Sequence, residues 1–103
     1  MTMGDDFNQA VEDWEKHCEK PEVQIHSMAG PHCDCDAYRS IVAMGDDALP
    51  LIRDYLNNEG ELSGWFVYAV LEITGGKLPE EMRFRGLGER VHYMRTWLNE
   101  KYA

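Results

Sequence analysis

The sequence predicts an all-α fold, a single compact bundle of about five helices in 103 residues. Apolar residues recur at spacings of three and four through most of the chain, which is the period of an amphipathic helix. No segment shows the alternation of apolar and polar residues that indicates a half-buried strand. Hydrophobic residues make up 44% of the chain, which is enough to fill one core of this size without disulfide bonds.

An amphipathic helix is predicted for residues 5–19. Its inward positions follow helical spacing and are Phe7, Ala10, Val11, Trp14 and Cys18. Asp5 or Asp6 is expected to cap its start, because a carboxylate there accepts a hydrogen bond from a free backbone N–H. Pro21 is expected to end the helix, because proline lacks an N–H and clashes with the preceding turn.

Two short helices joined by a turn are predicted for residues 38–58. The inward side chains are Tyr38, Ile41 and Val42 on the first and Leu51, Ile52, Tyr55 and Leu56 on the second. Gly45 is expected to end the first helix, since glycine readily adopts the left-handed conformation found there. Asp46 or Asp47 is expected to open the second helix, with Pro50 in its first turn.

A longer and more apolar helix is predicted for residues 62–76. Apolar side chains cover much of its circumference, so we expect it at the centre of the fold, ended by Gly75 and Gly76. Residues 77–86 lack a regular period and are interpreted as a connection. The last helix covers residues 87–101, with an inward stripe of Leu87, Val91, Met94 and Leu98.

The chain is thus expected to form one domain, residues 1–103, as a monomer or homodimer. Residues 1–20 hold an acidic helix, residues 21–36 a loop rich in cysteine and histidine, and residues 37–103 the helical core. Short connections favour antiparallel neighbours in that core. The residues expected to be buried are Trp14, Tyr38, Ile41, Leu51, Ile52, Trp65, Phe66, Val70, Val91 and Leu98.

Several segments of the core resemble a known pattern. The runs YRSIVAMGDDALPLIRDYL and WFVYAVLEITGG, followed by MRTWL, resemble an uncharacterised family of small bacterial and phage α-helical proteins. The resemblance covers Tyr38 to about Leu98 and consists of core and turn residues, so it implies a fold and names no catalytic group. The turn around Met44 and Pro50 is also similar to a HEAT-type helical hairpin, although only one such unit is visible.

The net charge of −9 is concentrated in the first three quarters of the chain. Residues 1–76 hold fifteen acidic and four basic residues, whereas residues 77–103 hold four acidic and six basic residues. The acidic part would repel a phosphate backbone, so direct binding of nucleic acid is disfavoured. A basic partner surface would be attracted to it.

Seven carboxylates lie on or beside the first predicted helix, and they are Asp5, Asp6, Glu12, Asp13, Glu15, Glu19 and Glu22. Such a face is often only a solvated surface, but the charge exceeds the magnitude of about 2–8 that is typical of a small soluble domain. We therefore predict that this surface binds a basic protein. A sharper version of the prediction is an inhibitor that mimics nucleic acid and binds a nucleic-acid-handling or phage-defence complex.

The stretch HSMAGPHCDCDAY, residues 26–38, raises the alternative of a zinc-stabilised structural or regulatory domain. Cys18, His32, Cys33 and Cys35 would supply the four thiolate and imidazole ligands that structural zinc takes. The spacing of Cys33 and Cys35 is one residue shorter than the usual Cys-x-x-Cys. The preferred interpretation is therefore a surface loop with reduced thiols and no cofactor, in which Asp34 or Asp36 caps the next helix.

The sequence carries no recognisable catalytic motif. It has no glycine-rich phosphate loop, HExxH or nucleophile elbow, and no third residue is positioned to orient His32 beside Cys33. We therefore expect a protein that is not an enzyme. No apolar run approaches the ~20 residues that span a bilayer, no apolar signal segment is recognisable, and the cysteine number is odd, so we expect no membrane association and a cytoplasmic location.

Overall fold

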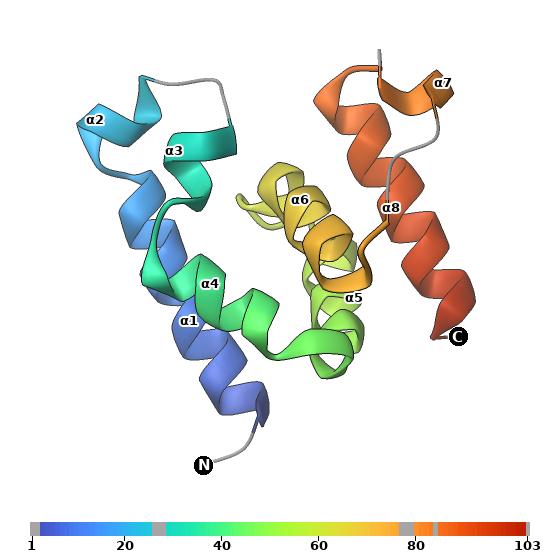
Figure 1. The fold of residues 1–103 in the computed structure, drawn as a ribbon, viewed down its shortest axis with the longest axis horizontal. Helices are drawn as coiled ribbons and strands as arrows, with labels where there is room; N and C mark the ends of the chain where they lie inside the picture. The colour runs from blue at the N-terminus through green and yellow to red at the C-terminus, as the bar shows by residue number, and fades with distance from the viewer. Residues whose placement is uncertain (1–2, 26–28, 77–79, 84, 103) are drawn as a thin grey trace.

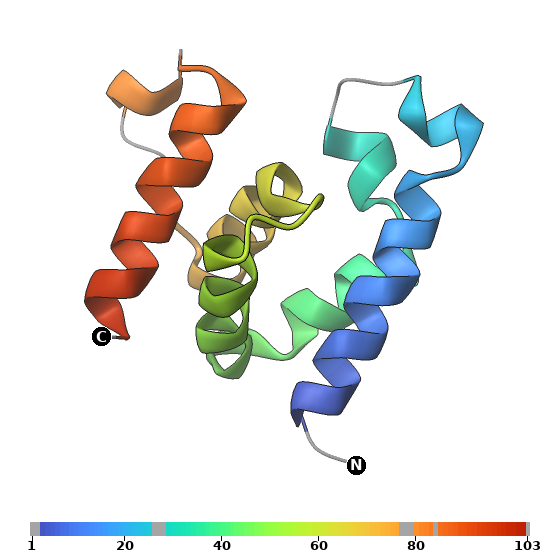
Figure 2. The same ribbon diagram turned by 180° about the vertical axis from the view of Figure 1, so that it is seen from behind.

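The helices of this protein pack around one apolar helix at the centre (Figures 1 and 2). A computed structural model describes residues 3–25, 29–76, 80–83 and 85–102. No residue in these ranges is in a strand, which confirms the predicted all-α class. The elements in chain order are α1 (Met3–Cys18), α2 (Pro21–Gln24), α3 (Ala29–Cys33), α4 (Asp36–Ala43), the 3₁₀ turn η1 (Gly45–Ala48), α5 (Leu49–Asn57), α6 (Ser63–Thr74), α7 (Glu80–Arg83) and α8 (Leu87–Lys101).

Helix α6 occupies the centre, as its apolar circumference predicts. It packs against α3, α4, α5 and α8, which approach it from different sides (Figure 1). Its buried residues are Phe66, Val67, Ala69 and Val70. Helices α4 and α5 were expected to form an antiparallel hairpin, but α4 packs mainly on α1 and α6, α5 packs mainly on α8, and the 3₁₀ turn η1 lies between them.

Aromatic rings from four helices meet around Phe66. The ring of Phe66 lies 4.9 Å from Trp14, 4.7 Å from Tyr55 and 6.0 Å from Phe7, measured between centroids. Trp14 also lies edge-on to Tyr38 at 5.1 Å. Such separations are those at which aromatic pairs attract one another. The cluster therefore joins α1, α4, α5 and α6 into one core.

Most of the predicted core is confirmed. Trp14, Tyr38, Ile41, Ile52, Phe66, Val70 and Leu98 are buried, whereas Leu51, Trp65 and Val91 are only half-buried. Trp65 differs because one residue turns the helix by about 100°, which moves its ring to the margin of the side on which Phe66 is buried. There it stacks on His32 with centroids 4.2 Å apart. The side chain of Leu87 lies outside the described part of the structure.

Two glycines end helices where the sequence predicts. Gly45 follows α4 with φ of +67°, and Gly75 closes α6 with φ of +66°. Both values are in the left-handed region that favours glycine. Pro50 lies in the first turn of α5, also as predicted. Asp46 and Asp47 do not open α5 directly, because they belong to the 3₁₀ turn that precedes it.

The segment predicted as a Cys/His loop contains two short helices. Pro21 does not merely end α1, since it occupies the first turn of α2, where its missing N–H has no intrahelical partner to lose. Helix α3 then places His32 and Cys33 in its last turn. The predicted connection over residues 77–86 likewise contains α7. These helices span four or five residues, which is too short for a hydrophobic period to reveal them.

The predicted carboxylate caps are wrong. Helix α1 begins at Met3, so Asp5 and Asp6 lie inside its first turn instead of preceding it. Cys35 holds the N-cap position of α4 and makes no side-chain capping hydrogen bond. Asp34 and Asp36 instead bind the guanidinium of Arg39, with N–O distances of 3.2 and 3.0 Å. Asp34 and Asp36 flank the N-cap position and do not occupy it.

Candidate functional site

The seven carboxylates predicted as one binding surface are distributed over several sides of the molecule. Helical periodicity places Glu12, Glu15 and Glu19 on one flank of the first helix and Asp6 and Asp13 on the other. Glu19 continues the last turn of α1, because its N–H donates to the carbonyl of Glu15 at 3.1 Å. Glu22 lies on the separate helix α2. The prediction of a single acidic face therefore has to be narrowed to one flank.

Glu61 joins the flank that carries Glu12, Glu15 and Glu19, and these four residues are named here the carboxylate cluster. The pKa of Glu15 is raised first by partial burial and then by the charges of Glu61, Glu19 and Glu12. Glu61 lies in the connection between α5 and α6, which projects toward α1 in the rear view (Figure 2). Tertiary folding thus adds a fourth negative charge from a distant part of the chain.

The carboxylate cluster is not neutralised by the described part of the chain. Within residues 3–25, 29–76, 80–83 and 85–102, none of its four carboxylates forms an ion pair. Ion pairs between described residues engage Asp34, Asp36, Asp54, Glu59 and Glu89. The cluster therefore presents uncompensated negative charge.

The opposite flank of α1 has a lower density of negative charge. Asp6, Asp13 and Asp36 line an open hollow of about 310 Å³ between α1 and α4. Lys16 and Lys20 line an adjoining hollow, also beside Asp13 and Asp36, and offset part of that charge. The carboxylate cluster is therefore the stronger candidate for attracting a cationic partner.

Side chains of α1 hold the short helix α3 through its backbone carbonyls. Trp14 Nε1 donates to the carbonyl of His32 at 2.7 Å, and Cys18 Sγ donates to the same oxygen at 3.7 Å. His17 Nε2 donates to the carbonyl of Pro31 at 2.8 Å. The last carbonyls of a helix have no intrahelical partner, so these bonds satisfy groups that would otherwise lack one. His17 and Cys18 thereby acquire a structural role.

The four predicted zinc ligands lie in this same region, but the structure gives them packing roles. The imidazole of His32 is buried against Trp65. Burial raises the pKa of Cys18 to about 11 and that of Cys33 to about 12, so both thiols are protonated at neutral pH, whereas zinc binds thiolates. Among the described residues, no group of three or more His, Cys, Asp and Glu side chains could hold a metal ion. Zinc binding by Cys18, His32, Cys33 and Cys35 stays a prediction, which elemental analysis of untagged protein would test.

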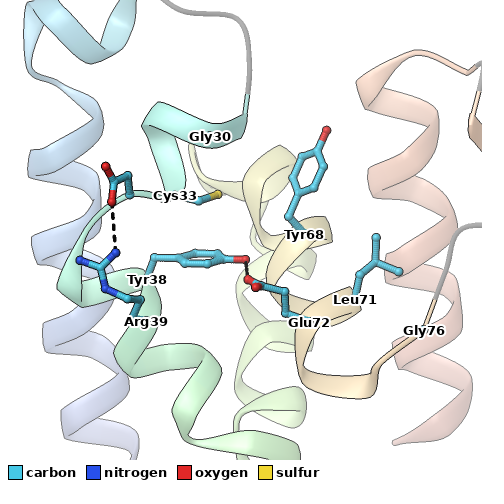
Figure 3. Close-up of a pocket in the computed structure, with 9 residues that line it drawn as sticks. Gly30, Cys33, Tyr38, Arg39, Tyr68, Leu71, Glu72 and Gly76 are labelled. Atoms are coloured by element: carbon cyan, nitrogen blue, oxygen red, sulfur yellow. Dashed lines mark hydrogen bonds and ion pairs between the residues drawn. The ribbon is translucent and has the colours of Figure 1, made fainter.

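An open hollow of about 610 Å³, which the sequence did not indicate, lies between α3, α4 and α6 (Figure 3). Its lining includes Cys33, Tyr38, Arg39, Tyr68, Leu71 and Glu72. The Tyr38 side chain reaches across from α4, and its hydroxyl donates a hydrogen bond to the Glu72 carboxylate on α6. Burial and this hydrogen bond raise the pKa of Tyr38 above its ordinary value, so the hydroxyl remains a donor.

No family model, curated protein or solved structure matches this chain. The resemblance to small bacterial and phage proteins stays a prediction. None of the helices described by the structure combines the length and apolar character that crossing a bilayer requires. The carboxylate cluster and the hollow between α3, α4 and α6 are therefore the two candidate functional sites of the described structure.

Proposed function

We propose that the chain is a protein–protein interaction module, without enzymatic activity, that binds a basic surface of its partner through the carboxylate cluster. The observation that carries this proposal is the grouping of four carboxylates, none of which forms an ion pair within the described residues. Partial burial and then the charges of the other three raise the pKa of Glu15. Like charges four residues apart on a helix, such as Glu15 and Glu19, destabilise it by roughly 0.2–0.5 kcal/mol. Lys or Arg side chains of a partner would relieve that repulsion on binding.

The carboxylate cluster has a suitable length for contact with several cations. At about 1.5 Å per residue, Glu12 and Glu19 lie roughly 10 Å apart along the helix axis, with Glu15 between them. Glu61 adds a carboxylate from another segment. Complementary charges of this kind accelerate association and select partners, and their effect decreases as salt screens them.

Two matched variants test the proposal. The cluster variant carries Glu12→Gln, Glu15→Gln, Glu19→Gln and Glu61→Gln. The control variant removes the same charge at four exposed positions elsewhere, with Asp46→Asn, Asp47→Asn, Glu80→Gln and Glu100→Gln. Each immobilised protein is incubated with host lysate over a series of salt concentrations, and recovered proteins are quantified by mass spectrometry.

We expect the wild-type chain and the control variant to retain a partner protein with a basic surface, and the cluster variant to lose it. The amount of this partner recovered should fall as the salt concentration rises. Displacement of this partner by duplex DNA would support the sharper version, in which the chain occupies the basic groove of a nucleic-acid-handling complex. If the cluster variant and the control variant retain the partner equally, or if retention does not depend on salt, the proposed electrostatic interface is contradicted.

A further inference from the structure

The hollow between α3, α4 and α6 shares no residue with the carboxylate cluster. Its volume of about 610 Å³ is within the range of about 300–1,000 Å³ found for small-ligand pockets. Most of its lining residues come from α3, α4 and α6, whereas Asp34 and Gly76 lie in the segments that follow α3 and α6. Figure 3 shows that Tyr38 extends across the hollow toward Glu72.

The charged residues of the hollow leave an excess of negative charge. Arg39 is engaged by Asp34 and Asp36, so its positive charge is more than offset. Glu72 forms no ion pair with any residue that the structure describes. A carboxylate has about four acceptor positions, and the Tyr38 hydroxyl engages one of them. Glu72 therefore retains capacity to accept hydrogen bonds from a cationic donor.

The other residues that line the hollow offer apolar surface to the carbon skeleton of such a donor. Leu71 and the ring of Tyr68, both on α6, supply apolar surface to the hollow. Aromatic faces also attract cations. Cys33 adds no charge, because burial raises the pKa of its thiol to about 12. An anionic ligand would instead meet Asp34 and Glu72, which would repel it.

We propose that this hollow binds an organic cation, an alkylguanidinium or alkylammonium group, through the Glu72 carboxylate and the apolar surface of Tyr68 and Leu71. In this arrangement Tyr38 is a positioning residue, since its hydroxyl holds the Glu72 carboxylate toward α4. Such a group occurs in free small molecules and in the Arg or Lys side chain of a protein. Both sources present the same chemistry to the hollow.

Titration of the full chain with n-butylguanidinium, followed by amide NMR shifts, tests the proposal. The neutral compound n-butylurea has nearly the same shape and is the matched control ligand. We expect n-butylguanidinium to shift the amide resonances of Cys33, Tyr68 and Glu72, and n-butylurea to leave them unchanged. Glu72→Gln should weaken binding roughly tenfold, because it removes a charge-assisted hydrogen bond while keeping an acceptor for Tyr38.

Glu100→Gln removes the same charge at an exposed position outside both proposed sites and should leave the affinity unchanged. Tyr68→Leu should weaken binding severalfold through loss of the ring, and circular dichroism establishes that each variant remains folded. A second arm replaces n-butylguanidinium with a blocked Gly-Arg-Gly peptide. Tighter binding of the peptide indicates a protein side chain as the source, and exclusion of the peptide indicates a small molecule.

Equal shifts with n-butylguanidinium and n-butylurea would overturn the proposal, as would unchanged affinity in Glu72→Gln. Loss of binding in Glu61→Gln but not in Glu72→Gln would assign the cation to the carboxylate cluster instead. Because the partner-retention experiment uses variants that leave Glu72 intact, failure of either proposal can be recognised without the other.

Discussion

Helix α8 and the flank of α1 that bears the carboxylate cluster both carry charged side chains, but they use them differently. Arg95 on α8 pairs with Glu59 at 3.5 Å, and the ammonium of Lys101 lies 5.0 Å from the ring centroid of Trp97. Beside Glu15 on α1, partial burial and then the charges of three more carboxylates raise the pKa of its side chain. The bases of α8 thus contribute to the fold, whereas the acids of the cluster oppose one another.

The inward sides of the same two helices are alike. Trp14 on α1 and Leu98 on α8 are both fully buried. The difference between the helices therefore concerns only their outer charges, and it is this difference that indicates a binding surface on α1. Grouped charges that add nothing to stability are more readily explained by an external partner than by folding.

The largest effect is expected from Trp14→Ala, which should lower the free energy of unfolding by about 3–5 kcal/mol. Trp14 is buried among aromatic rings and also donates to the carbonyl of His32. Leu98→Ala on α8 should cost about 2–5 kcal/mol. Urea denaturation measures both values. Trp65 is only half-buried, so Trp65→Ala should lower the free energy of unfolding less than Trp14→Ala. A Trp65→Ala loss equal to that of Trp14→Ala would contradict the described core.

Tyr38→Phe should lower the free energy of unfolding by about 1 kcal/mol, because it removes the hydrogen bond to Glu72 and keeps the buried ring. Tyr68→Phe is the matched control, since the hydrogen bond of the Tyr68 hydroxyl with Arg90 is long, at 3.5 Å. A double-mutant cycle of Tyr38→Phe with Glu72→Gln, followed by urea denaturation, isolates the interaction. Additive losses would show that Tyr38 and Glu72 do not interact.

Arg95→Gln on α8 should lower the free energy of unfolding by about 0.2–1 kcal/mol, the range for partly exposed ion pairs. The loss should shrink at high salt, because the Glu59 partner is largely exposed and salt screens the pair. Thermal denaturation at low and high salt measures the change. An unchanged free energy of unfolding at low salt would mean that Arg95 does not stabilise the fold. The contrast between the charges of α8 and the carboxylate cluster on α1 would then disappear.

Glu15→Gln should have the opposite effect and raise the free energy of unfolding at neutral pH by roughly 0.2–0.5 kcal/mol. The pKa of Glu15 is raised above its ordinary value of 4.5 in the folded state, so the folded state binds its proton more tightly than the unfolded state. Stability of the wild type therefore falls as pH rises from 4.5 through the folded-state pKa. The advantage of the variant should be complete above that window and disappear below pH 4.5.

Thermal denaturation across this pH range measures the effect. Glu22→Gln, at an exposed position on α2, is the control and should leave stability nearly unchanged at every pH. A destabilised Glu15→Gln protein at neutral pH would mean that Glu15 serves the fold, and the proposed binding surface would lose its main support.

The sequence by itself determined the all-α class, the bounds of α6 and α8 to within a residue or two, and the glycines that end α4 and α6. These features follow from local patterns. A helix of twelve or more residues repeats its apolar period several times, and glycine at a helix end reflects the conformation of a single residue. The acidic character of α1 can also be read from the sequence, because it depends only on amino-acid composition.

Tertiary structure alone decided the features that depend on residues far apart in sequence. Helix α3 is held by Trp14, eighteen positions from the carbonyl that it binds, and the hollow depends on Tyr38 and Glu72, thirty-four positions apart. Likewise, Glu61 joins the carboxylate cluster because tertiary packing brings the connection between α5 and α6 close to α1. No local pattern encodes these contacts, because each arises where packing of the aromatic core brings separate helices together.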